Sequence, residues 1–135
     1  MFQAAISYEG MTDEEIFLND IKEYEAAGKK FAIACVDAWD EDAVEGLATR
    51  MKATMNKVEP SLGVDMVFVQ VSIFHDDLSK SYLLASNDAA ADVLKEAFGE
   101  KLEFDGTSYI LGPGVSRKQV LVPAISDVLA AFPQE

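Results

Sequence analysis

Positive charge is scarce in this chain. Its 135 residues include 11 lysines and arginines, only two of them arginines, against 24 aspartates and glutamates, so the formal net charge is −13. Extended contact with nucleic acid or an anionic membrane depends on clustered Lys and Arg side chains. The composition therefore argues against both kinds of partner, and it requires that any anionic ligand be met by a local group of cations.

Cysteine and long apolar runs are also lacking. The single Cys35 cannot form an internal disulfide, which fits a reducing compartment. No apolar run approaches the roughly 20 residues that span a bilayer, and residues 1–6 lack the basic region of a secretory signal. We therefore expect a cytoplasmic protein. A chain of this length that is half hydrophobic can form one compact domain with a core, but not two.

The first third of the chain predicts a short helix and a hairpin. Residues 12–15 have the spacing of a capping box and open a helix that carries Ile16 and Phe17. Residues 20–25 alternate like a half-buried strand, yet their composition would also continue the helix. Gly28 and the apolar run after it favour a hairpin, with an interior strand as its second arm.

A long amphipathic helix is expected next, capped by Asp40 and stopped by Pro60 and Gly63. Its apolar residues share one face and are expected in the core: Val44, Leu47, Met51, Met55 and Val58. The following run, 66–74, is almost continuously apolar and rich in β-branched residues, which predicts a strand at the sheet centre, covered on both faces.

The remaining elements continue the alternation of strands and helices. We expect a neighbouring strand at 81–85, a helix from Asn87 or Asp88 to Phe98, a strand at 107–111, and a last helix with Pro123 at its first position. Its apolar face carries Ile125, Val128, Leu129 and Phe132. The whole pattern predicts an α/β fold: a single domain with a mixed β-sheet packed by helices.

One basic motif stands out against the acidic background. The stretch 112–119 reads Gly-Pro-Gly-Val-Ser-Arg-Lys-Gln, so Arg117 and Lys118 follow a glycine-rich hinge and precede an apolar segment. Arginine offers a planar fork of donors and lysine a mobile point charge, a combination suited to phosphoryl oxygens. On residue chemistry alone, a solvated basic pair is the commoner outcome, because surface charges usually face water.

Other candidate residues have plainer explanations. His75, Asp76 and Asp77 could ligate a divalent ion, but adjacent residues rarely converge on one ion, so a polar surface turn is favoured. The acidic residues at 37 and 40–42 are interpreted as helix-capping and solvated groups. Cys35 is interpreted as a small buried side chain. Trp39 fits either packing beneath the helix that follows or contact with another domain.

The order of these landmarks resembles the C-terminal domain of manganese-dependent (family II) inorganic pyrophosphatases, the second type of domain associated with DHH phosphoesterases. The resemblance covers roughly residues 2–132. It includes Asp20-Ile21-Lys22-Glu23-Tyr24, Gly28-Lys29-Lys30, the apolar strand, Glu96-Ala97-Phe98-Gly99, and Pro113-Gly114-Val115-Ser116-Arg117-Lys118 with Pro123. The Ser-Arg-Lys motif is its most specific element.

The resemblance implies a two-domain enzyme that hydrolyses pyrophosphate. Its N-terminal DHH domain, which has no counterpart in this sequence, would bind the manganese or magnesium, and this chain would carry no metal. Arg117, Lys118 and Lys22 match the family's phosphate-binding cations, and Gly114 and Ser116 would support the loop. The chain alone would then be inactive, and its uncovered apolar surface would favour self-association.

Two alternatives to this function stay open. The family usually has Lys-Gln after the Arg-Lys pair, whereas this chain has Gln119 and Val120, so one positive charge is missing. The parent enzyme could therefore be an exopolyphosphatase or another DHH phosphoesterase. A stand-alone, non-enzymatic module that binds an anion or a partner chain is the second alternative.

Overall fold

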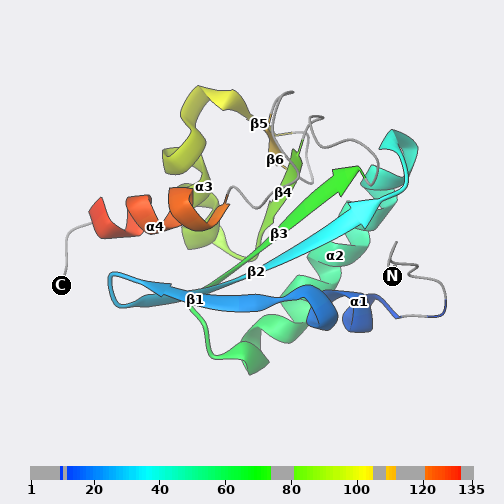
Figure 1. Cartoon of the computed structure of the whole chain (residues 1–135), viewed down its shortest axis with the longest axis horizontal. Helices are drawn as coiled ribbons and strands as arrows, with labels where there is room; N and C mark the ends of the chain where they lie inside the picture. The colour runs from blue at the N-terminus through cyan, green and yellow to red at the C-terminus, as the bar shows by residue number, and fades with distance from the viewer. Residues whose placement is uncertain (1–9, 11, 74–80, 105–108, 112–120, 132–135) are drawn as a thin grey trace, which may run out of the picture.

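A six-stranded sheet lies between two layers of helices in the computed structural model (Figure 1), which describes residues 10, 12–73, 81–104, 109–111 and 121–131. The helices are α1 (Asp13–Asp20), α2 (Glu41–Leu62), α3 (Asp88–Phe98) and α4 (Leu121–Ala131), with a short 3₁₀ turn at Gly99–Lys101. The strands are β1 (Lys22–Ala26), β2 (Lys29–Ala38), β3 (Met66–Ile73), β4 (Ser81–Ala85), β5 (Leu102–Phe104) and β6 (Tyr109–Leu111).

The sheet is mixed, as predicted. Its strand order is β1-β2-β3-β4-β6-β5; β2 and β3 are parallel and joined by α2, and every other neighbouring pair is antiparallel. Residues 20–25, which were ambiguous in the sequence, become the end of α1 and most of the edge strand β1. The turn to β2 is formed by Ala27 and Gly28, both with positive φ (53° and 82°), which is the backbone of a tight hairpin turn.

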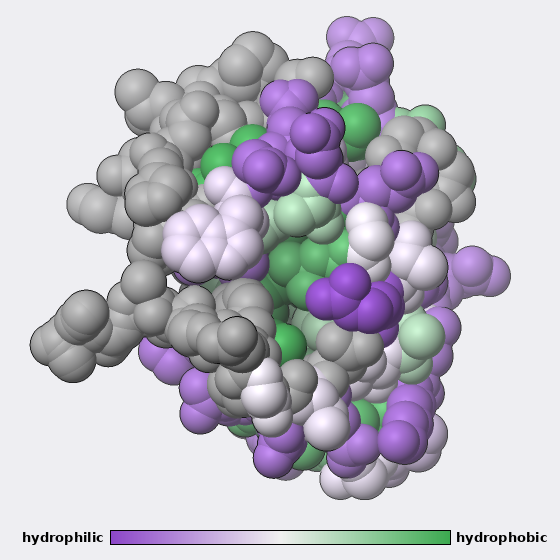
Figure 2. All heavy atoms as spheres, turned by 90° about the vertical axis from the view of Figure 1, so that its right-hand side faces the viewer, coloured by the Kyte–Doolittle hydropathy of each residue, from purple (hydrophilic) through white to green (hydrophobic). Residues whose placement is uncertain are grey.

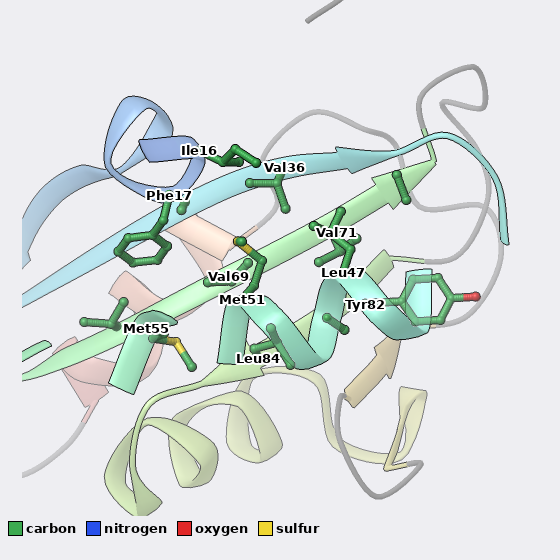
Figure 3. Packing of buried hydrophobic residues seen from close by; sticks show 14 of the residues in the cluster. Ile16, Phe17, Val36, Leu47, Met51, Met55, Val69, Val71, Tyr82 and Leu84 are labelled. Atoms are coloured by element: carbon green, nitrogen blue, oxygen red, sulfur yellow. The ribbon is translucent and has the colours of Figure 1, made fainter. Parts of the chain in front are cut away.

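Side chains on the two faces of the sheet form two separate cores. On one face, Phe17 of α1 and Met51 and Met55 of α2 are fully buried against β3 (Figure 3). On the other, Phe31 and Phe68 pack with α3 and α4. Burying a side chain of this size contributes about 1.5–3 kcal/mol. The strand β3 is covered on both faces, as its continuous apolar run predicted.

Side-chain caps fix where the helices begin. Thr12 and Glu15 form the predicted capping box of α1, Asp40 accepts from the backbone of Ala43, and Asn87 accepts from the backbone of Ala90. Each such cap contributes about 1 kcal/mol. The C-terminal cap of α2 is Gly63 in the left-handed region, where glycine lacks the steric penalty of other residues.

Two expectations about element bounds were wrong, and one strand was missed. Pro60 does not stop α2, which continues to Leu62; a proline in the last turn removes only one backbone hydrogen bond, and Gly63 ends the helix. The helix α4 begins at Leu121, so Pro123 is its third residue rather than its first, at a position where its missing N–H still has no intrahelical partner. The strand β5 was not predicted. Thr107, Ser108 and Phe132 lie outside the described residues.

Candidate functional site

Strand directions bring three carboxyl ends to the same edge of the sheet. The strands β2, β3 and β6 run in one direction and end at Ala38, Ile73 and Leu111, and the antiparallel β4 starts from that side at Ser81, whereas β1 starts at Lys22, opposite Ile33 in the middle of β2. We call this side the carboxyl edge. Figure 2 views it directly and shows a hollow, apolar centre bordered by hydrophilic groups. Ligands of open α/β sheets bind outside the carboxyl ends of the strands.

Lys22 stands at the start of the edge strand β1 and is exposed to solvent. It pairs with Ile33 of β2, two residues before Tyr24 pairs with Phe31. The rings of Tyr24 and Phe31 stack with centroids 5.6 Å apart. Because side chains two apart on a strand share a face, Lys22 projects from the face that α3 and α4 cover.

The carboxylate of Asp20 interacts electrostatically with both Lys22 and Asp37. Asp20, at the end of α1, is half-buried, and this burial raises the pKa of its carboxyl above the ordinary value of 3.8. The charge of Asp37, on β2, raises that pKa further, whereas the ammonium of Lys22 lowers it. Asp37 is therefore partly buried and electrostatically coupled to its neighbours, which corrects its interpretation as a simply solvated group.

A buried amide lies behind this edge and was not predicted. Gln70, in the middle of β3, is 1% exposed, and its Nε2 donates to the Oγ of Ser81 at 3.2 Å. Its Oε1 is buried and has no hydrogen-bond partner among the residues described. Gln70 pairs with Cys35, and Ser72 pairs with Asp37, so these polar residues lie on the same face as Lys22. The sequence hints at this buried polar contact only through one amide, Gln70, within the apolar run 66–74.

The structure leaves several of the predicted residues undescribed. Gly114, Ser116, Arg117 and Lys118 fall in 112–120, and His75, Asp76 and Asp77 fall in 74–80. The described residues that flank 112–120 are Leu111, at the carboxyl edge, and Leu121, which starts α4. Both flanking leucines are buried in the core beneath α3 and α4.

The described residues contain neither a metal-ligand cluster nor a membrane-spanning helix. Among the described residues, no group of three or more His, Cys, Asp or Glu side chains is placed to hold a metal ion. No described helix combines the length and apolarity needed to cross a membrane.

Two single residues, Trp39 and Cys35, differ in burial. Trp39, for which the sequence left two placements open, is 63% exposed at the end of β2. Cys35 is partly rather than fully buried.

Comparison with known proteins identifies the domain. The sequence model of the DHHA2 domain matches residues 1–128. The chain belongs to the DHHA2 domain family. This confirms the resemblance noted in the sequence, and the α/β fold is that of the pyrophosphatase C-terminal domain.

Relatives of this DHHA2 domain are metal-dependent pyrophosphatases. The chain is 32% identical over 131 residues to the manganese-dependent inorganic pyrophosphatase of Bacillus subtilis, covering 96% of this chain and 40% of that protein. It is 31% identical over 130 residues to the cobalt-dependent inorganic pyrophosphatase of Clostridium perfringens, covering 96% of this chain and 23% of that one. The chain thus spans less than half the length of these relatives.

A solved structure shares the fold. The crystal structure of a Methanococcus jannaschii protein assigned to the family II inorganic pyrophosphatases superposes with a TM-score of 0.68, covering 88% of this chain and 36% of that one at 24% sequence identity. At this identity, the similarity establishes the fold of the DHHA2 domain rather than its activity.

Proposed function

We infer that this DHHA2 domain is the substrate-binding domain of an inorganic pyrophosphatase that hydrolyses diphosphate to two phosphates. The domain would act with an N-terminal DHH domain, within one protein of which residues 1–135 form the C-terminal part. Family membership and the pyrophosphatase relatives support this function. The structural observation that carries it is Lys22, an exposed cation at the start of the edge strand β1, on the face of the sheet against which Leu111 and Leu121 are buried.

Only a short connection separates the basic motif from α4. Arg117 and Lys118 precede Leu121 by four and three residues. A fully extended chain spans at most about 3.6 Å per residue, so three or four residues form a short connection to the start of α4. The flanking residues Leu111 and Leu121 are both buried on the face of the sheet that carries Lys22, which supports a shared phosphate site.

Each basic residue has a role that its chemistry suits. Arg117 would donate from its planar fork to two oxygens of one phosphoryl group, and Lys118 and Lys22 would act as point charges on the rest of the diphosphate. Gly114 and Ser116 would form the turn that presents this pair. Diphosphate and its transition state carry several negative charges, so these cations would position the substrate and neutralise it.

Manganese, or magnesium, would be held by the DHH domain rather than by this chain. Among the described residues, Asp20 and Asp37 interact electrostatically, but no group of three His, Cys, Asp or Glu side chains is placed to hold a metal ion. When bound, such metals generate the attacking hydroxide from water. The residues of this chain would hold the phosphates and exclude water, so we propose that the isolated domain is inactive.

Steady-state kinetics of the complete two-domain enzyme test this function. Lys22→Gln, Arg117→Gln and Lys118→Gln should each lower kcat/KM for pyrophosphate by about tenfold or more, because a hydrogen bond to a charged group is worth about 1.5–3 kcal/mol. The control is Lys57→Gln: Lys57 is an exposed lysine on α2 that pairs with Glu14 at 3.0 Å. Unchanged kinetics in the three site variants would dismiss the proposal.

The substrate itself distinguishes the remaining alternatives. Gln119, in place of a further lysine, leaves room for an exopolyphosphatase or another DHH phosphoesterase, and comparing pyrophosphate, polyphosphate and nucleotide hydrolysis separates these enzymes. A stand-alone module that binds an anion or a partner chain would be encoded without a DHH domain in the same polypeptide, whereas the gene of the enzyme would encode both domains. A cytoplasmic location stays a prediction. Self-association of the chain also stays a prediction, and sedimentation at high protein concentration tests it.

A further inference from the structure

A pocket of about 440 Å³ lies at the opposite end of the sheet from the carboxyl edge. Its walls are Lys52 of α2, the 85–88 junction between β4 and α3, Ala91, and the rings of Phe104 and Tyr109. The last residue of β4, Ala85, pairs with Phe68 in the amino-terminal half of β3, which places the end of β4 on this side of the sheet. Pockets that bind small molecules are typically about 300–1,000 Å³ and combine apolar walls with a few polar groups.

The polar group best able to bind a ligand is Lys52. Its ammonium donates to the carbonyl oxygen of Ala85, which leaves two further N–H donors. No carboxylate of the described residues lies within ion-pair distance of it. Partial burial lowers the pKa of Lys52, while the charges of Glu59 and Asp88 raise it. A partly buried ammonium without a carboxylate in contact is suited to an anion.

The junction behind Lys52 is already fixed. The Oγ of Ser86 accepts from the backbone N–H of Val67 at 3.0 Å and donates to Glu59. Asn87 Nδ2 donates to Glu59 at 3.0 Å and to the carbonyl oxygen of Asp65 at 3.2 Å. These contacts tie α2, β3 and α3 together. A wall held in this way needs no ordering when a ligand binds, which lowers the entropic penalty of binding.

The apolar wall is aromatic and open to solvent. Phe104 is 59% exposed at the end of β5, and its ring packs on Tyr109 with centroids 4.7 Å apart at an interplanar angle of 37°. An aromatic face of this kind stacks well against a planar ring. Stacking of a nucleobase on an aromatic side chain is worth about 1–3 kcal/mol.

We propose that this pocket binds a nucleoside monophosphate. The base stacks on Phe104 and Tyr109, and the phosphate is held by the free donors of Lys52. The carboxylate of Asp88 accepts hydrogen bonds from the ribose hydroxyls, a role that acidic residues fill in other nucleotide sites. The pocket lies beside β4, β6 and β5, whereas Lys22 is on β1 at the other side of the sheet, so the pocket is independent of the proposed pyrophosphate site.

Calorimetric titration of the 135-residue chain with AMP tests the proposal. Saturable binding is expected, and Phe104→Ser and Lys52→Met should each weaken it by about tenfold or more, given the stacking and charge-assisted contacts they remove. The matched controls are Lys57→Met, an exposed lysine of the same helix, and Trp39→Ser, an exposed aromatic residue at the carboxyl edge. Both controls should bind AMP like the parent chain.

Folding of the variants and the choice of ligand need their own controls. Thermal unfolding checks that each variant folds, and Lys52→Arg, which keeps the cation, should bind AMP even if Lys52→Met does not fold. Adenosine and inorganic phosphate should each bind more weakly than AMP. The proposal is overturned by an absence of saturable AMP binding, by unchanged affinity in Phe104→Ser, by equal losses in the two controls, or by phosphate binding as tightly as AMP.

Discussion

Gln70 and Ser81 are joined by a buried hydrogen bond across β3 and β4, from Nε2 to Oγ at 3.2 Å. The bond satisfies one end of the amide, whereas the other end, Oε1, is buried without a partner among the described residues. An unpaired buried acceptor costs about 1–3 kcal/mol of stability. Such a group is uncommon in a folded core, and here it lies on the face that carries Lys22.

The two partners of this bond predict unequal mutational effects. Gln70→Met at similar volume removes the unpaired oxygen, a gain that offsets the loss of the donor to Ser81 Oγ, so the free energy of unfolding should stay nearly constant. Ser81→Ala leaves Nε2 without its acceptor and should lower that free energy by about 1–3 kcal/mol. Urea denaturation of both variants measures the difference. Equal destabilisation by the two changes would show that Oε1 is satisfied in solution.

Asp20 predicts a pH dependence of stability. Its folded-state pKa is raised above 3.8 by burial first and by Asp37 second. The folded chain therefore holds this proton more tightly than the unfolded chain, and ionisation of Asp20 lowers stability as the pH rises through the two pKa values. Asp20→Asn should stabilise the chain at neutral pH and lose that advantage below the ordinary pKa. Glu45→Gln, at an exposed site on α2, is the control.

Carbon-detected NMR titration of Asp20 checks why its pKa is raised. Asp37→Asn should lower the pKa of Asp20, because it removes a like charge, and Lys22→Gln should raise it, because it removes an opposite one. A pKa of Asp20 that is insensitive to both changes would mean that these three groups lie farther apart than the structure places them.

The β1–β2 turn predicts a stabilising substitution. Ala27 has φ 53°, where a side chain is strained, and Gly28 has φ 82°. Ala27→Gly or Ala27→Asn should raise the free energy of unfolding by up to about 1 kcal/mol, because both residues tolerate this conformation. Gly28→Ala should lower it. Thermal unfolding of the three variants tests the turn, and a destabilised Ala27→Asn chain would contradict this geometry.

Much of the fold could be predicted because its signals are local. The capping residues Thr12, Asp40 and Asn87 and the two-sided apolar strand β3 mark their own elements. The strand β5 was missed because three residues are too few to show a period. Its place in the sheet comes from pairing with β6.

The candidate site was predicted only in part. Lys22 was found because the family motif includes it, and its exposure on an edge strand agrees with that role. Gln70 was missed because its contact, Ser81, lies eleven residues away on another strand. The coupling of Asp37 to Asp20 was missed for the same reason, since it depends on how α1 packs beside β2.

Pyrophosphate titration of the isotopically labelled chain, followed by amide NMR, tests the proposed phosphate site most directly. The account predicts that pyrophosphate shifts the amides of Lys22, Leu111 and Leu121 and leaves those of Ala27 and Gly28, at the far end of the β1–β2 hairpin, in place. These shifts should disappear in Arg117→Gln. Shifts confined to the far end of the sheet, or shifts that persist undiminished in Arg117→Gln, would contradict it.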